Sequence, residues 1–97
     1  MIKTFKNKAT EDIYNGEATK AAIRACPKKI WKIATRKLDR LDSILFLDEL
    51  RVPSGNRLET LSGPRKGQFS IRINDQFRIC FKWGESGPED VEITDYH

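Results

Sequence analysis

The chain has 97 residues, of which 38% are hydrophobic and 33% are charged, with a formal net charge of +4. This composition excludes a disordered chain, a collagen-like chain and a disulfide-rich scaffold, and the length predicts a single domain. No apolar run approaches the roughly 18 residues of a membrane span, and the N-terminus lacks the apolar stretch of a signal peptide, so the sequence predicts a cytosolic protein without a membrane partner.

The N-terminal half predicts helices after one short strand. Residues 2–6 alternate apolar and polar and predict a strand, and Thr10 is the expected N-cap of a brief helix that ends at Asn15-Gly16. Residues 17–26 are ambiguous between helix and loop. After Pro27, apolar residues recur at helical spacing and predict a long helix with one apolar stripe. The stripe consists of Ile30, Ala34, Leu38, Leu41 and Leu45. A second short helical piece is expected to carry Phe46, Leu47 and Leu50.

The C-terminal half predicts strands. Residues 58–61, 69–73, 77–83 and 91–93 are apolar or alternate apolar with polar, and turn residues separate them. Strands joined by such short turns run antiparallel, and their apolar faces need a cover. The predicted fold class is therefore α+β, with N-terminal helices packed on one face of an antiparallel β-sheet.

Charge and cysteine usage limit the possible partners. Residues 20–40 contain eight basic residues and one acid, whereas residues 83–97 contain five acids and no Lys or Arg. The basic segment favours phosphate-bearing or acidic partners, and a solvated helix face is the alternative. Cys26, Cys80 and a single His do not have the spacing of a metal site, so we expect no metal and two buried thiols that act as small apolar fillers.

The polar face of the predicted sheet carries the candidate chemistry. Arg72 and Arg78 lie on either side of one turn, so their side chains can converge. The preceding loop at residues 63–67, Gly-Pro-Arg-Lys-Gly, adds Arg65 and Lys66, and we call it the glycine loop. The chain ends in an acid, a phenol and its only imidazole. Alternation places these side chains on the face away from the helices: Ser70, Arg72, Arg78, Cys80, Lys82, Glu92, Thr94 and Tyr96.

This grouping suits RNA cleavage without a metal ion. Attack of a ribose 2′-hydroxyl on the adjacent phosphate needs a base, an acid for the leaving oxygen, and cations for the developing charge. Histidine can serve either proton role, and arginine offers a fixed donor fork to phosphate oxygens. The alternative interpretation is a frayed terminal His and arginines that pair with nearby acids.

Several segments resemble the HigB toxins of the RelE-like superfamily of bacterial toxin–antitoxin systems. They are residues 56–63, 67–81 and 91–97, together with the opening residues 1–5. The most specific signals are the series Gly-x-x-Ser-Ile-x-x-Asn-x-x-x-Arg-Ile, which starts at Gly67, and the terminal Asp95-Tyr96-His97.

The resemblance implies a small mRNA endonuclease of the bacterial cytoplasm, without metal or cofactor, that cuts translated messages in the ribosomal A site. It also implies a cognate HigA-like antitoxin with a helix-turn-helix. The toxin–antitoxin complex binds its operator DNA only through this antitoxin. Carried over by position, Arg78 holds the scissile phosphate and His97 is the main proton-transfer group. Asp95 and Tyr96 shape or assist the site. The phosphate-binding candidates with less support are Arg65, Arg72 and Lys66.

The sequence departs from the family pattern on the strand before the glycine loop. Many members have a His and then a Lys there, and the matching positions in this sequence are Glu59 and Ser62. Glu59 can act as a base but supplies no positive charge to a phosphate, which predicts slower cleavage unless Arg65 or Lys66 compensates.

The helix predicted after Pro27, which carries most of the basic segment and which we call the basic helix, has more than one possible partner, and the protein has more than one possible function. Lys32 and Arg36 are expected to dock on ribosomal RNA, with the antitoxin and a plain solvated face as the alternatives. The chain itself can instead be an antitoxin-binding co-repressor with weak nuclease activity or a gyrase inhibitor of the ParE type. A generic RNA-binding module is disfavoured, because no aromatic series on the polar face resembles a stacking platform.

Overall fold

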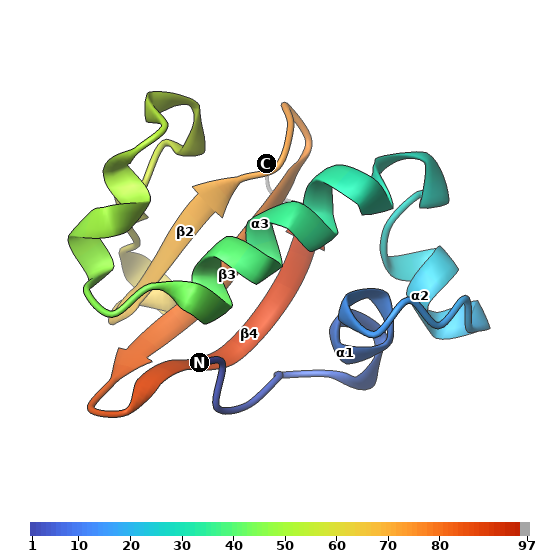
Figure 1. The fold of residues 1–97 in the computed structure, drawn as a ribbon, viewed down its shortest axis with the longest axis horizontal. Helices are drawn as coiled ribbons and strands as arrows, with labels where there is room; N and C mark the ends of the chain where they lie inside the picture. The colour runs from blue at the N-terminus through green and yellow to red at the C-terminus, as the bar shows by residue number, and fades with distance from the viewer. Residues whose placement is uncertain (96–97) are drawn as a thin grey trace.

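The computed structural model describes residues 1–95, and Tyr96 and His97 lie outside the described residues. A four-stranded antiparallel sheet forms one layer, and helix α3 crosses one face of it (Figure 1). The predicted α+β architecture is confirmed. The helices, short 3₁₀ turns and strands are, in chain order, α1 (Lys8–Tyr14), α2 (Lys20–Ala25), η1 (Lys28–Ile30), α3 (Trp31–Ser43), η2 (Leu47–Arg51), η3 (Ser54–Asn56), β1 (Glu59–Thr60), η4 (Gly63–Arg65), β2 (Gln68–Arg72), β3 (Phe77–Gly84) and β4 (Gly87–Asp95). Within residues 1–95, no helix has the length and apolar character needed to cross a bilayer.

The core lies between α3 and the sheet. Helix α3 turns Leu38 and Leu41 inward, where neither side chain retains exposed surface, and they join Ile71, Ile79 and Phe81 of the sheet in one buried cluster. Each buried aliphatic side chain of this kind stabilises the fold by roughly 1.5–3 kcal/mol. The predicted apolar stripe is thus confirmed along α3 itself.

The stripe ends earlier than the spacing predicts. Helix α3 stops at Ser43, and the extended backbone of Ile44 turns the chain away from the helix axis. Leu45 and Phe46 are consequently 79% and 70% exposed, and the backbone N–H groups of both residues donate to one carboxylate oxygen of Glu49. The prediction of Leu45 as a core residue was therefore wrong.

The N-terminal helices differ from the prediction at one cap. Asn7, not Thr10, caps α1, and its side-chain oxygen accepts a hydrogen bond from the Thr10 N–H at 2.9 Å. Thr10 is buried one turn later, where its hydroxyl oxygen accepts from the N–H of Ile93 in β4 at 3.0 Å. Asn caps helices as well as Thr does, so local propensity could not decide between the two. Helix α2 resolves the ambiguous segment and is capped by Thr19.

The sheet has the order β1-β2-β3-β4. Residues 2–6 do not form the predicted strand. They make one parallel bridge, between Phe5 and Val91, along the outer edge of β4. Near this bridge, on the opposite edge of β4, the register of β4 against β3 shifts, and Asp90 adopts a φ of 50°. Strand β1 is also shorter than predicted, at two residues.

Candidate functional site

Antiparallel pairing brings the predicted polar residues into two rows on one face of the sheet. Directly paired residues share a face, so the register defines each row. One row joins Glu59, Ser70, Cys80 and Glu92 across all four strands, and the other joins Arg72, Arg78 and Thr94. The predicted face is confirmed for its members within residues 1–95, and Arg72 and Arg78 are direct partners across their turn, as predicted.

Arg78 lies near the centre of this face, and its side chain is 14% exposed. Its guanidinium donates to the Ser70 hydroxyl at 3.2 Å and lies 3.4 Å from a carboxylate oxygen of Glu59 on β1. Partners on two other strands thus fix the direction of the donor fork. The residue that we predicted to hold a phosphate is a half-buried, oriented cation.

Arg65 reaches the same face from the glycine loop. Gly63, the first residue of η4, and Gly67, two residues after its end, have φ values of 63° and 92°, which favour glycine because a Cβ would be strained there. This backbone folds the loop back over the sheet. Arg65 then donates to a carboxylate oxygen of Glu92 at 2.8 Å and to the side-chain oxygen of Gln68 at 3.1 Å. Lys66 follows at the end of η4 with an exposed side chain.

Cys80 lies beneath these charged side chains and has no exposed surface. Burial raises the pKa of its thiol, and the opposing charges around it are those of Arg65, Glu92, Arg78 and Lys6. Ser70, which accepts from Arg78, and Glu92, which accepts from Arg65, are the cross-strand neighbours of Cys80, so the two arginines converge on one small area of the sheet. We call Glu59, Arg65, Ser70, Arg78, Cys80 and Glu92 the sheet-face cluster.

Arg72 is held at the edge of this area. It forms an ion pair with Asp75 in the β2–β3 turn, and the hydrogen bond from Arg72 lowers the pKa of the Asp75 carboxyl. Arg72 also stands directly opposite Arg78, a like-charge pairing that costs stability unless each cation has its own partner. Asp75 and Glu59 supply those two partners.

The predicted C-terminal residues are only partly described. Asp95 is paired with Phe77, so its side chain starts on the core-facing side of the sheet, and its carboxylate accepts a hydrogen bond from the Gln76 amide at 3.0 Å. The predicted roles of Tyr96 and His97 fall outside the described residues. Ser62 is exposed at the start of η4.

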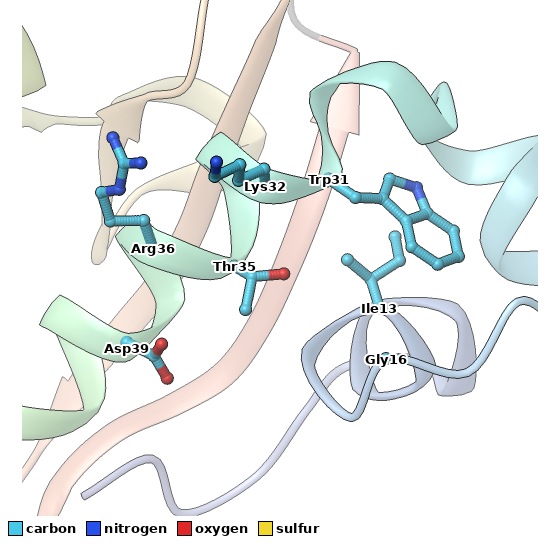
Figure 2. Close-up of a pocket in the computed structure, with 7 residues that line it drawn as sticks. All are labelled: Ile13, Gly16, Trp31, Lys32, Thr35, Arg36 and Asp39. Atoms are coloured by element: carbon cyan, nitrogen blue, oxygen red, sulfur yellow. The ribbon is translucent and has the colours of Figure 1, made fainter.

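Lys32 and Arg36 lie in the other layer, on α3. With Asp39, Thr35 and the floor residues Ile13, Gly16 and Trp31 they line an open hollow of about 480 Å³ between α1 and α3 (Figure 2). Neither Lys32 nor Arg36 takes part in an ion pair with another residue in the range 1–95. The predicted RNA-binding residues thus separate into two surfaces on different layers.

The structure adds two residues to which sequence analysis assigned no role. Ser70 accepts a hydrogen bond from Arg78, and Glu92 accepts one from Arg65. The available signal was alternation, which placed both on the polar face, but nothing in the spacing showed that their side chains are buried. Across residues 1–95, no three His, Cys, Asp or Glu side chains are grouped so that they could hold a metal ion.

Sequence comparisons match the chain to a family of known proteins. Residues 3–97 match the family described as "RelE-like toxin of type II toxin-antitoxin system HigB". Toxin HigB-1 of Vibrio cholerae serotype O1 is 40% identical over 83 residues, which are 86% of this chain and 84% of that protein. An uncharacterized protein of Haemophilus influenzae is 35% identical over 57 residues, 59% of this chain and 56% of that protein.

Solved structures match the fold along the whole chain. Two structures of the YoeB-YefM complex from Staphylococcus aureus each cover 100% of this chain, with TM-scores of 0.61 and 0.60 at 16% sequence identity. At that identity the likeness concerns the fold alone. Family membership rests on the sequence matches: the chain belongs to the HigB family of RelE-like toxins of type II toxin–antitoxin systems.

Proposed function

We propose that this toxin is an endoribonuclease that cuts mRNA on the ribosome and so inhibits translation. The observation that carries the proposal is the convergence of Arg65 and Arg78 on one half-buried face of the sheet, with the Glu59 carboxylate 3.4 Å from Arg78. Two oriented guanidinium groups match the charge and geometry of a phosphodiester. A cytoplasmic location follows from a ribosomal substrate.

The proposed reaction uses side chains of this chain. Arg78 binds the non-bridging oxygens of the scissile phosphate and stabilises the negative charge that develops there. Glu59, beside Arg78, accepts the proton of the 2′-hydroxyl as its oxygen attacks phosphorus. The bond to the 5′-oxygen breaks, and His97, assisted by Tyr96, gives that oxygen a proton. Asp95, whose carboxylate accepts a hydrogen bond from Gln76, shapes the end of β4 in this proposal. The products are a 2′,3′-cyclic phosphate and a 5′-hydroxyl.

The same contacts support a low rate. A phosphate must compete with Glu59 for Arg78 and with Glu92 for Arg65. In addition, β1 contributes the negatively charged Glu59 where many relatives have a positively charged side chain. Arg65 is positioned to replace part of the missing charge, since its guanidinium lies over the same face as Arg78. Arg72 and Lys66 are the outer phosphate contacts in this proposal.

The partner is a cognate antitoxin. One of the matched Staphylococcus aureus structures is described as a heterotetrameric toxin–antitoxin complex, and the family description names a type II system. We propose a HigA-like antitoxin with a helix-turn-helix, which neutralises the toxin and through which the pair binds operator DNA.

The test maps RNA ends in cells that express wild type, Arg78→Gln or His97→Ala. Wild type should produce 5′-hydroxyl ends in phase with codons on translated messages. Loss of Arg78 should lower cleavage about 100-fold, the usual cost of removing one charge-stabilising donor. Lys82→Gln is the matched control, because Lys82 is on the same strand in an ion pair whose side chains are 52% and 49% exposed.

Growth arrest without codon-phased cuts would contradict the proposal. In that case a supercoiling assay with purified gyrase tests the ParE-like alternative. Binding to the antitoxin and operator without growth arrest would instead support the co-repressor alternative.

A further inference from the structure

Glu92 is the buried acid of the sheet-face cluster, and it contacts cations from two separate segments of the chain. Its side chain is 11% exposed, and one carboxylate oxygen lies 2.8 Å from Arg65 and 3.6 Å from Lys6. Arg65 comes from the glycine loop, 27 positions before Glu92. Lys6 comes from residues 2–6, which lie along the outer edge of β4 and which we call the edge segment. A buried carboxylate is expensive unless charged donors satisfy it, so both contacts bear on where Glu92 can lie.

The backbone holds Glu92 firmly on its own strand. It pairs with Cys80 on β3, and its neighbour Val91 exchanges backbone hydrogen bonds with the edge segment, from the Lys6 N–H at 2.9 Å and to the Thr4 carbonyl at 3.1 Å. The loop that carries Arg65 is less constrained. Its backbone bonds in η4 are short-range turn contacts at 3.1 and 3.3 Å, and most of its residues are exposed. The rigid partner is the carboxylate and the adjustable one is the guanidinium.

We propose that Glu92 is a positioning residue, whose carboxylate holds the Arg65 guanidinium over the sheet face beside Arg78 and so sets the second phosphate contact of the RNA site. This inference rests on the proposed function. Arg65 is already 31% exposed in the ion pair, so without the carboxylate its guanidinium keeps the bond to Gln68 but loses its charged partner on β4 and can turn toward water while the core stays packed. Lys6, whose side chain is 52% exposed, supports Glu92 only weakly.

The experiment compares wild type with Glu92→Gln, Arg65→Gln and the double variant in the full chain. Cleavage of mRNA on programmed ribosomes should fall ten- to hundredfold in Glu92→Gln, roughly the effect of misplacing a binding group. Because Glu92 acts through Arg65, adding Glu92→Gln to Arg65→Gln should change the rate less than twofold. Glu92→Asp, which keeps the charge but withdraws it by one methylene, should give an intermediate rate.

A second readout does not depend on cleavage. In the free protein, the side-chain N–H signals of Arg65 in an NMR spectrum should be resolved and slow to exchange. In Glu92→Gln they should broaden or move to the position of solvated arginines. Asp90→Asn is the matched control: it makes the same carboxylate-to-amide change on the same strand, in an exposed pair with Lys82 at 3.5 Å, and should leave both readouts unchanged.

Three outcomes overturn the inference. The first is an unchanged Arg65 signal in Glu92→Gln, and the second is full cleavage activity in Glu92→Gln. The third is that Glu92→Gln lowers the cleavage rate by the same factor in Arg65→Gln as in wild type. If Glu92→Gln fails to fold, Glu92→Asp carries both readouts. If wild type cleaves no message, the proposed function fails, whereas the NMR comparison still decides whether Glu92 positions Arg65.

Discussion

The sheet face and the basic segment of the helical layer treat their cations in opposite ways. On the sheet face each arginine has its own carboxylate, in the pairs Arg78 with Glu59, Arg65 with Glu92, and Arg72 with Asp75. On the helical layer the exposed cations of the basic segment from η1 into α3 take part in no ion pair with the rest of residues 1–95. These cations are Lys28, Lys29, Lys32, Arg36 and Arg40, of which Arg40 donates to the backbone carbonyl oxygen of Glu49 at 3.2 Å.

This difference indicates two kinds of electrostatic work. A paired, half-buried guanidinium has a fixed direction, so it can place one phosphate against a proton-transfer group at the cost of competition with its carboxylate. An unpaired cation on a helix surface has no fixed direction, but its field extends about 8–10 Å at physiological salt and attracts any polyanion. The sheet face is suited to chemistry on one bond, and the basic helix surface to docking.

The largest effect is expected on the sheet face, from Glu59→Gln. As the proposed base, Glu59 should lower kcat about 100-fold when it is replaced by an amide. KM should fall at the same time by roughly two- to fivefold, because Arg78 no longer shares its donors with a carboxylate in a partly exposed pair. Single-turnover and steady-state cleavage on programmed ribosomes separate the two constants.

Glu85→Gln, an exposed acid in the β3–β4 turn, is the control for the change of net charge. An unchanged kcat in Glu59→Gln would show that β1 contributes structure and competition only. The paired cations would then bind phosphate without a neighbouring base on β1.

An effect of about tenfold is expected on the helical layer, from the double reversal Lys32→Glu with Arg36→Glu. Loss of two phosphate contacts should weaken ribosome binding about tenfold at physiological salt and flatten its salt dependence by a slope of roughly 1.5. The cleavage step of bound toxin should stay unchanged, because these residues lie in the other layer. Ribosome pelleting across a salt series measures the affinity.

The matched control makes the same change of net charge on α2, as Lys20→Glu with Arg24→Glu. If both double variants pellet like wild type, the basic helix does not dock on the ribosome. Weaker antitoxin binding in the α3 variant alone would then assign that surface to the antitoxin.

Local periodicity explains which parts of this comparison could be predicted from the sequence. Alternation along β2 and β3 is a property of each strand, and the short turn between them sets the register that brings Arg72 opposite Arg78. The Arg65–Glu92 pair could not be predicted in the same way. It depends on a loop folded by two glycines at positive φ and on residues 27 positions apart.

The errors have the same origin. Thr10 has the chemistry of an N-cap, but a tertiary bond to the Ile93 N–H on β4 uses its hydroxyl, and Asn7 caps the helix instead. Leu45 fits the helical spacing, but the backbone turns at Ile44 before the stripe reaches it. In both cases a long-range contact or a change of chain direction overrides a local pattern.

The smallest expected effect extends the paired-charge principle to the helical layer, at Asp12 in α1. Its carboxylate is 2% exposed and accepts hydrogen bonds from Lys8 at 2.9 Å and Thr19 at 2.8 Å, and these bonds, the one from Lys8 first, lower its pKa below the ordinary value of 3.8. The unfolded chain therefore takes up this proton at higher pH than the folded chain does. The stabilisation is complete above the pKa of Asp12 in the unfolded chain and is lost as the pH falls through its pKa in the folded chain.

Asp12→Asn should lower Tm at neutral pH, and the difference in Tm from wild type should narrow as melting is followed down to about pH 3. Lys8→Gln should show a smaller difference in Tm with the same pH trend. If the Tm difference of Asp12→Asn is instead constant with pH, packing and not the ion pair stabilises this end of the helical layer.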